Sequence, residues 1–373
     1  MLSKISFTLR QKMKSFLQNV ILPAVYFIFK NIYRKEPELI VFADAHHNEI
    51  PYSMQRIHAE LEKKGYKITD VFEDYSQMSF IGSSLSAVRF MKTYAKAKVV
   101  FICDNFLPVA SCRKRKETTV VQLWHSCGLL KKMGYDTTED IPAGYKGNVY
   151  RNYDLLTVSA PALEEVFAKA TRLDRSVVKA LGVSRSDIFF DEEWHKECVS
   201  DFYEQYPEAK GKKIILWAPT FRGNAHNPHL EGAEAIKALE SSLPDDYLVI
   251  TKVHPHMETK YRLSSCPIPT ERLLPVTDLL ITDYSSVFFD FLFFGRPAVL
   301  FAPDLEEYEK KRGFYVEYSS LCPHIVTDGK DLGRAVLSAI KGADASHLEK
   351  LREYHISGCD GSSTERIIKA AGL

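Results

Sequence analysis

Short apolar runs alternate with helical patterns along almost the whole chain. The runs are rich in Val, Ile and Leu and lie at residues 38–43, 66–71, 97–103, 118–124, 155–158, 213–218, 247–253, 279–282 and 298–301. Residues 51–64, 160–170 and 232–241 have the apolar spacing of amphipathic helices. Strands that alternate with helices form parallel, doubly wound sheets. We therefore predict an α/β fold of two Rossmann-like domains that face each other across a cleft.

A polar stretch at residues 189–212 separates the two groups of strands. The chain has 373 residues, which is enough for two domains of ordinary size. The predicted boundary therefore falls near residue 200, between domains at residues 36–200 and 201–373.

The first 35 residues form a separate, basic segment. No acidic residue precedes Glu36, and residues 16–29 are mostly apolar but shorter than the ~20 residues that a membrane span needs. The segment predicts an amphipathic helix at the membrane interface, whose cations face anionic lipid. Its lipid-facing residues would be Phe7, Phe16, Leu17, Val20, Ile21 and Leu22. A helix docked on its own domain and a true membrane span are the alternatives.

Charge and cysteine content exclude several classes of protein. Forty-nine Lys and Arg against 48 Asp and Glu leave a net charge of +1, so no overall field attracts nucleic acid. The 7 cysteines include no Cys-x-x-Cys pair, which argues against a disulfide framework and a structural zinc site. We expect a protein of the reducing cytosol that carries no metal or cofactor.

A turn rich in small polar residues follows the run at residues 279–282. Asp283, Ser285 and Ser286 precede an apolar helical pattern, and such a turn can bind phosphate through its hydroxyls and the positive end of the helix. Ser285 as a simple helix cap is an equal alternative. Asp290 lies among phenylalanines, where a buried carboxylate needs a ligand hydroxyl or another donor.

Two other strand ends supply donors for a diphosphate. Lys252 and His254 end the run at residues 247–253 and point to the same side. The run at residues 213–218 is followed by Pro219, Thr220, Arg222 and Gly223. A metal site at His254 and His256, a structural role for His254, and a surface ion pair for Arg222 are the alternatives.

His125, at the end of the run at residues 118–124, is the candidate general base of the N-terminal half. Cys127 as a nucleophile paired with His125 is disfavoured, because two residues so close on one turn do not face each other. Residues 44–49, DAHHNE, resemble metal ligands, but we interpret them as an ordinary polar loop.

Five segments resemble the CDP-glycerol glycerophosphotransferases of wall teichoic acid synthesis. They are LWHSCGLLKKMG, LGVSRSD, WAPTFRG, KVHPH and ITDYSSVFFDFLFFGRP, within residues 123–297, followed by a DGSSTER tail. The resemblance implies a GT-B fold with an acceptor-side domain at residues 36–200 and a CDP-alcohol-binding domain at residues 201–373. It further implies that the last helices pack back on the first domain and that residues 1–35 face the membrane.

The same resemblance assigns roles to individual residues. His125 matches the catalytic base, His254 a second catalytic residue, and Arg185 an arginine near the diphosphate, although Ser184 replaces the proline of the family pattern. Together with the strand-end analysis, it gives the predicted substrate-binding set Ser126, Gly128, Arg185, Pro219, Thr220, Arg222, Lys252, Asp283, Ser285, Ser286 and Asp290.

The implied reaction is in-line attack of an acceptor hydroxyl on the β-phosphorus of CDP-glycerol, with release of CMP. The acceptor would be an undecaprenyl-diphosphate-linked disaccharide, met at the cytoplasmic face of the membrane. The short chain and the WHSCG form resemble a priming enzyme more than a polymerase. A ribitol-phosphate or polymerising member, a nucleotide-sugar glycosyltransferase, a metal-dependent hydrolase and a non-catalytic scaffold stay open, as does assembly into homo-oligomers.

Overall fold

The computed structural model describes residues 12–143, 145, 147–224, 227–253, 261 and 263–373. They belong to two compact units, the first formed by residues 1–125, 144–187 and 358–373 and the second by residues 126–143 and 188–357. These units differ from the predicted domains at residues 36–200 and 201–373, because the chain passes from one unit to the other after residues 125, 143, 187 and 357.

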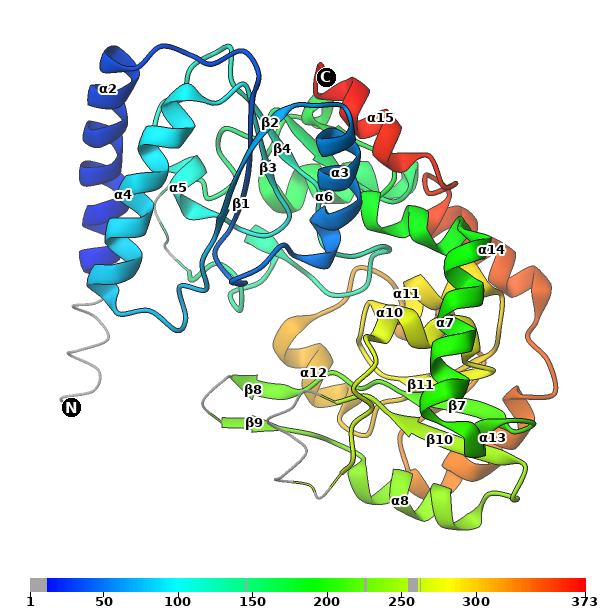
Figure 1. Ribbon diagram of the computed structural model, residues 1–373. Helices are drawn as coiled ribbons and strands as arrows, with labels where there is room; N and C mark the ends of the chain where they lie inside the picture. Colours follow the sequence, from blue (N-terminus) through cyan, green and yellow to red (C-terminus); the bar gives the residue numbers. More distant parts are fainter. Residues whose placement is uncertain (1–11, 144, 146, 225–226, 254–260, 262) are drawn as a thin grey trace. The chain divides into compact units, whose positions relative to one another are not determined.

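The first unit is built on a six-stranded parallel sheet of order β2-β1-β3-β4-β5-β6 (Figure 1). Its strands are β1 (Leu39–Asp44), β2 (Lys67–Phe72), β3 (Val99–Ile102), β4 (Thr119–Gln122), β5 (Leu155–Thr157) and β6 (Val178–Lys179). The core joins β1 and β3 to helices α3 (Tyr52–Lys63) and α15 (Ser363–Ala370). The C-terminal helix α15 therefore completes the core of the first unit.

Three more helices of the first unit are α4 (Phe80–Lys96), α5 (Leu107–Ala110) and α6 (Glu164–Thr171). Ser79 caps α4 by accepting a hydrogen bond from the Gly82 N–H. Strand β1 is buried throughout, as expected for a parallel strand covered on both faces. The predicted α/β fold with parallel strands is thus confirmed in this unit.

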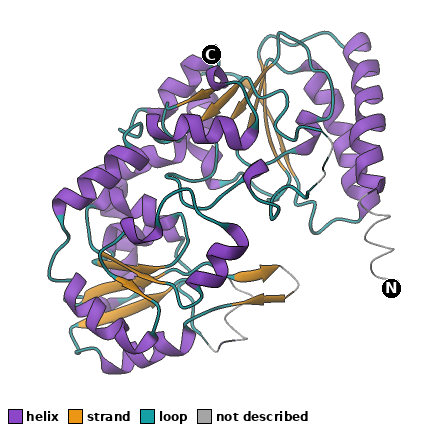
Figure 2. Ribbon diagram, turned by 180° about the vertical axis from the view of Figure 1, so that it is seen from behind, coloured by secondary structure: helices purple, strands orange, loops and turns teal. Residues whose placement is uncertain are grey.

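The second unit contains a five-stranded parallel sheet of order β10-β7-β11-β12-β13 and a two-stranded antiparallel hairpin (Figure 2). The sheet strands are β7 (Lys213–Trp217), β10 (Tyr247–Thr251), β11 (Leu279–Thr282), β12 (Ala298–Phe301) and β13 (Ile325–Val326), and the hairpin strands are β8 (Arg222–Asn224) and β9 (Asn227–His229). The helices are α7 (Glu192–Gln205), α8 (Ala233–Ser242), α10 (Thr270–Leu273), α11 (Val287–Phe291), α12 (Leu305–Arg312), α13 (Leu332–Ala339) and α14 (Ala345–Ile356).

The stretch at residues 189–212, predicted to separate the domains, begins just after the chain passes into the second unit at residue 188, and it contains helix α7. Asp191 caps the helix by accepting hydrogen bonds from the N–H groups of Glu193 and Trp194. Only Cys198 and Phe202 are buried on α7, so its apolar face is too narrow to be recognised within a highly polar sequence.

The N-terminal segment forms one helix, Lys12–Ile32, which is long and apolar enough to cross a membrane by length and composition. It contains a π-helical stretch, Leu17–Ile21, followed by α2 (Leu22–Ile32), which packs on α4 (Figure 1). Leu22 and Tyr26 are only 3% and 1% exposed, and the Tyr26 hydroxyl accepts a hydrogen bond from the Arg115 N–H. The prediction that Leu22 faces lipid is therefore wrong, because Leu22 is buried within the protein.

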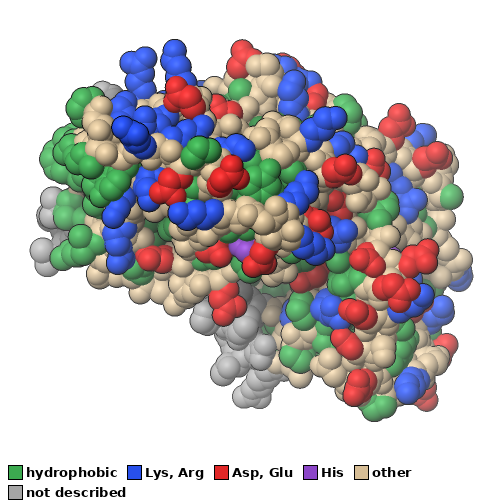
Figure 3. Space-filling view, turned by 45° about the horizontal axis from the view of Figure 1, so that its top comes forward, with side chains coloured by type: hydrophobic (Ala, Val, Ile, Leu, Met, Phe, Trp, Pro, Cys, Tyr) green, Lys and Arg blue, Asp and Glu red, His purple; other side chains and the backbone are tan. Residues whose placement is uncertain are grey.

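The opposite side of this helix is exposed and apolar. Together with two residues of α4 it forms what we call the apolar surface, visible at the upper left of Figure 3. Its residues are Phe16, Val20, Phe27, Ile28, Ile32, Ile81 and Leu85. The helix thus docks on its own unit through one side and exposes the other, while Phe7 lies outside the described residues.

Candidate functional site

A pocket of about 760 Å³ opens in the second unit beside the carboxyl ends of β7, β10 and β11. Loops that follow parallel strands gather at one edge of a sheet, which is where ligands of such folds bind. The lining residues are Lys131, Pro219, Thr220, Phe221, Leu230, Lys252, Val253, Ser265, Cys266, Pro267, Thr270, Ser285 and Ser286. We call this cavity the polar pocket; it brings together five residues of the predicted substrate-binding set.

The turn between β11 and α11 provides two hydroxyls to the polar pocket. Ser285 also acts as a cap, because its Oγ accepts a hydrogen bond from the Val287 N–H at 3.3 Å. Helix α11 has only 5 residues before it tightens into a 3₁₀ turn, so its dipole is small. An anion here would depend on the hydroxyls and on nearby cations more than on the helix end.

Thr220 offers a further polar atom to the polar pocket. Its Oγ1 is buried and has no hydrogen-bond partner among the residues that the structure describes. Buried hydroxyls in folded proteins are nearly always hydrogen-bonded. The unsatisfied Thr220 hydroxyl therefore fits a site that a polar ligand completes.

Two lysines supply positive charge to the polar pocket. Lys252 lines the cavity, and its Nζ donates a hydrogen bond to the Cys266 carbonyl at 2.7 Å. Burial lowers the pKa of Lys131, an effect that the Arg312 charge reinforces and Asp283 opposes. A bound phosphate would stabilise the protonated form of Lys131.

Sequence reasoning missed Lys131. The residue follows the predicted turn after β4, but its backbone pairs within the second unit. Lys131 forms an isolated β-bridge with Phe314, and the Lys132 N–H donates a hydrogen bond to the Gly313 carbonyl at 3.0 Å. The adjacent lysines of LWHSCGLLKKMG were the only signal. A pairing with residues about 180 positions later is invisible in a local pattern.

Gly128 has a packing role in the same segment. It adopts φ +72°, and a Cβ built on it would lie 2.1 Å from the Phe289 ring. Only glycine lets the segment approach α11 this closely.

The two predicted aspartates are both buried. Asp290 lies within α11, and Asp283 Oδ1 accepts a hydrogen bond from the Thr220 N–H at 2.9 Å.

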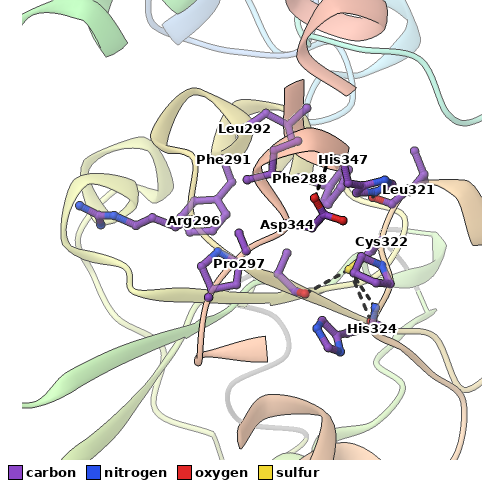
Figure 4. Close-up of a pocket in the computed structure, with 15 residues that line it drawn as sticks. Phe288, Phe291, Leu292, Arg296, Pro297, Leu321, Cys322, His324, Asp344 and His347 are labelled. Carbon is purple, nitrogen blue, oxygen red and sulfur yellow. Dashed lines mark hydrogen bonds between the residues drawn. The ribbon is translucent and has the colours of Figure 1, made fainter. Parts of the chain in front are cut away.

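A second pocket lies beside α11 (Figure 4) and is much smaller. Its volume of about 30 Å³ has room for a water molecule but not for a nucleotide. The Cys322 thiol there donates a hydrogen bond to the Ala298 carbonyl at 3.1 Å, and burial raises its pKa to about 11. A thiol held neutral in this way is a poor nucleophile.

His125 follows β4 in the first unit. The preceding Trp124 has φ +59°, an uncommon conformation for a bulky residue, and its ring stacks on the imidazole with centroids 5.1 Å apart. His125 Nδ1 lies 3.3 Å from the Cys103 carbonyl and 3.8 Å from Asp104 Oδ2. These acceptors favour the tautomer with the proton on Nδ1, which leaves Nε2 as the basic nitrogen.

The loop at residues 44–49 is organised by its own hydrogen bonds. Asp44 Oδ1 accepts the His46 N–H at 2.7 Å and lies 2.8 Å from His47 Nδ1. Among the described residues, the structure has no group of three His, Cys, Asp or Glu side chains that could hold a metal. His254 and His256 lie outside the described residues.

Arg185 lies in a segment that joins two of the motifs named above. The Asp187 carboxylate accepts the N–H groups of Ser363 and Thr364 at 3.0 and 2.7 Å, so LGVSRSD rests on the start of α15, within DGSSTER. Ser184, which replaces the family proline, bonds to Thr364 Oγ1 at 2.9 Å. The Arg185 guanidinium lies over the Tyr52 ring, 5.5 Å from its centroid.

Comparison with solved structures identifies the fold as GT-B-like. The structure matches the wall teichoic acid polymerase TagF with a TM-score of 0.76 and 20% identity, covering 100% of this chain and 98% of that chain. It also matches UDP-GlcNAc 2-epimerase from Neisseria meningitidis with a TM-score of 0.56 and 11% identity, covering 90% and 99% of the two chains. At these identities the likeness concerns the fold alone.

Sequence comparison gives the family. The sequence model of CDP-glycerol:poly(glycerophosphate) glycerophosphotransferases matches residues 25–371, and the chain belongs to this family. It is 31% identical to the teichoic acid ribitol-phosphate primase of Bacillus spizizenii, over 95% of this chain and 97% of that protein. It is 33% identical to the teichoic acid glycerol-phosphate primase of Bacillus subtilis, over 61% of each. The predicted family is thus confirmed.

Proposed function

We propose that this protein transfers one polyol phosphate from a CDP-activated polyol to a lipid-linked disaccharide and releases CMP. The observation that carries the proposal is the polar pocket, where Lys131, Lys252, Thr220 and the Ser285–Ser286 turn surround one cavity. These are the donors that a diphosphate requires. Phosphoryl transfer depends mainly on positioning and charge stabilisation, which such a pocket provides without covalent catalysis.

In the proposed reaction, the acceptor hydroxyl gives its proton to Nε2 of His125 while its oxygen attacks the β-phosphorus. The P–O bond to CMP breaks, and the two lysines balance the charge that grows on the departing phosphate. His125 ends the first segment of the first unit, and Lys131 of the polar pocket follows six positions later. Six residues span at most about 22 Å, so the chain limits how far the imidazole can lie from Lys131.

Glycerol and ribitol are both candidate polyols. The sequence predicts glycerol, whereas the match to a ribitol-phosphate primase extends over 95% of the chain and so favours ribitol as the second candidate. The test measures CMP release from CDP-glycerol and from CDP-ribitol, with and without a prenyl-diphosphate disaccharide. We expect acceptor-dependent CMP release from one of the two donors. Turnover of UDP-sugars without release of CMP would contradict the proposal.

Removal of the two hydroxyls of the β11–α11 turn is expected to weaken donor binding. Each hydrogen bond to a charged phosphate contributes about 1.5–3 kcal/mol, so Ser285→Ala/Ser286→Ala should raise the donor Kd at least about tenfold in calorimetry. Ser319→Ala/Ser320→Ala is the matched control, because these two serines are exposed and bond to Glu317. Equal donor affinity in the two double variants would argue against the polar pocket.

We also propose that the apolar surface places the protein at the cytoplasmic face of the membrane, where a lipid-linked acceptor is met. Ile28 and Ile32 are 52% and 66% exposed on α2, and Lys30 lies on the same helix. Apolar side chains can enter the lipid interface while basic residues face anionic headgroups.

Substitution of exposed residues tests this proposal better than truncation does. Deleting the helix would also remove Leu22 and Tyr26 from the protein interior. Phe27→Ser/Ile28→Ser/Ile32→Ser should instead reduce sedimentation with anionic vesicles several-fold, because each side chain loses up to ~1.5–3 kcal/mol of apolar burial. Leu337→Ser, at an exposed position of α13, is the control. Undiminished binding of the triple variant would contradict an interfacial role for α2.

A further inference from the structure

Arg222 is a tightly held cation near the polar pocket. Its side chain is 7% exposed, its Nε donates to Asp304 Oδ2 at 2.7 Å, and its Nη2 donates to Asp304 Oδ1 at 2.9 Å. Nη2 also lies 3.0 Å from Asp283 Oδ2. The guanidinium lies over the Tyr284 ring, 4.8 Å from its centroid. A planar, bidentate arrangement of this kind is specific to arginine.

This network reaches the polar pocket through Thr220. Arg222 Nη1 donates a hydrogen bond to the Thr220 carbonyl, and Asp283 Oδ1 accepts the Thr220 N–H at 2.9 Å. Asp283 Oδ1 also accepts the Tyr284 N–H at 2.6 Å, directly before Ser285. Both the backbone that carries the Thr220 hydroxyl and the turn that carries the serines are therefore fixed to the same ion pairs.

The charges of the network also affect how well the polar pocket can bind an anionic ligand. Burial tends to raise the pKa of Asp304, but the hydrogen bonds and charge of Arg222 outweigh it and hold that pKa below its usual range. Without Arg222, the carboxylates of Asp283 and Asp304 would lose their guanidinium partner close to a pocket that is proposed to accept a diphosphate. Removing one partner of a buried ion pair is costly for this reason.

We propose that Arg222 is a positioning residue that organises the donor site and makes no contact with the donor. Its salt bridges to Asp283 and Asp304 hold Thr220 and the Ser285–Ser286 turn in one arrangement before the donor binds. This inference rests on the proposed function of the polar pocket, and it replaces the sequence-based expectation that Arg222 itself binds substrate. A preorganised site binds more tightly because less order is imposed during binding.

Asp304→Asn distinguishes a positioning role of Arg222 from direct binding of the donor by Arg222. Asp304 is not among the described residues that line the polar pocket, yet it holds two of the guanidinium nitrogens. If Arg222 acts by positioning, Asp304→Asn and Arg222→Lys should each raise the KM for the donor about tenfold, with little change in the KM for the acceptor. If Arg222 binds the donor directly, Asp304→Asn should have little effect and Arg222→Lys should keep part of the affinity.

Two further variants show whether a rise in donor KM reflects the Arg222 network or a general loss of folding. Tyr284→Phe removes only the hydrogen bond from the Tyr284 hydroxyl to Asp304 Oδ1, 3.1 Å long, and should give a smaller rise in donor KM. Asp201→Asn breaks the ion pair between Arg272 and Asp201 in the same unit and should leave the donor KM unchanged. Circular dichroism and thermal melting confirm that each variant is folded.

A double-mutant cycle completes the experiment. The effects of Thr220→Val and Asp304→Asn on donor affinity should be non-additive, since Asp304→Asn loosens the network that positions Thr220. Calorimetry with CDP-glycerol and CDP-ribitol provides the affinities. Normal donor affinity in both Asp304→Asn and Arg222→Lys would overturn the positioning role alone. Failure of the unmodified protein to bind either donor would overturn the proposed function and this inference with it.

Discussion

His125→Ala is expected to lower kcat by about 10²–10⁴-fold, the usual contribution of a general base, while the donor Kd changes little. The imidazole belongs to the first unit, whereas the described residues that line the polar pocket all belong to the second. Its Nδ1 faces the Cys103 carbonyl at 3.3 Å, which leaves Nε2 to accept the proton of the acceptor hydroxyl. Chemistry and donor binding should therefore be separable by this substitution.

The measurement compares kcat with calorimetric donor affinity in the same preparation. His47→Ala is a suitable control, because His47 follows strand β1 of the same sheet and is half exposed. We expect normal turnover in the control. Near-normal turnover in His125→Ala would refute its assignment as the base, and a large loss of donor affinity would place it in donor binding instead.

The free energy of unfolding is expected to fall by about 2 kcal/mol between pH 7 and pH 5 because of His355. This imidazole is 2% exposed, and burial lowers its pKa from 6.5 to about 4. The unfolded chain takes up a proton below pH 6.5, whereas the folded chain does so only near pH 4. The stabilisation is therefore present above pH 6.5 and is lost as the pH falls towards 4.

His355→Asn should flatten this dependence. An asparagine can still accept the Leu129 N–H, which lies 3.3 Å from Nδ1 of His355, but it does not titrate. Urea unfolding at pH 7 and pH 5 measures the difference. His229→Asn, at an exposed position of the same unit, should keep the parent dependence. If His355→Asn loses as much stability on acidification as the parent, another group is responsible.

The predictions from sequence succeeded where the signal was local. Runs of β-branched and apolar residues became strands, since side chains buried on both sides of a parallel sheet leave a continuous apolar pattern. Thr220, Lys252 and Ser285, proposed from sequence as substrate contacts, line one pocket because each follows a recognisable strand and the ends of parallel strands meet. Lys131 was missed because its segment leaves one unit to pair within the other.

Long-range contacts decided what several residues do. Leu22 belongs to an apolar helix in sequence, but only the packing of α2 on α4 determines which side is buried. In sequence, Arg222 resembles a substrate contact because it follows a strand end. Its ion-pair partner Asp304 lies 82 positions away, so the pairing is not visible in the local sequence. Within the polar stretch at residues 189–212, Glu192–Gln205 form helix α7, which Asp191 caps and which buries Phe202.

The amino-acid sequence by itself determined the parallel α/β architecture, the family and the loops from which the polar pocket is built. Each of these depends on side-chain periodicity or on short motifs, which are properties of neighbouring residues. The tertiary structure alone decided that Lys131 joins the pocket, that Arg222 is bound within the protein, and which side of the first helix is exposed. These outcomes depend on contacts between distant segments, which form only when the whole chain packs.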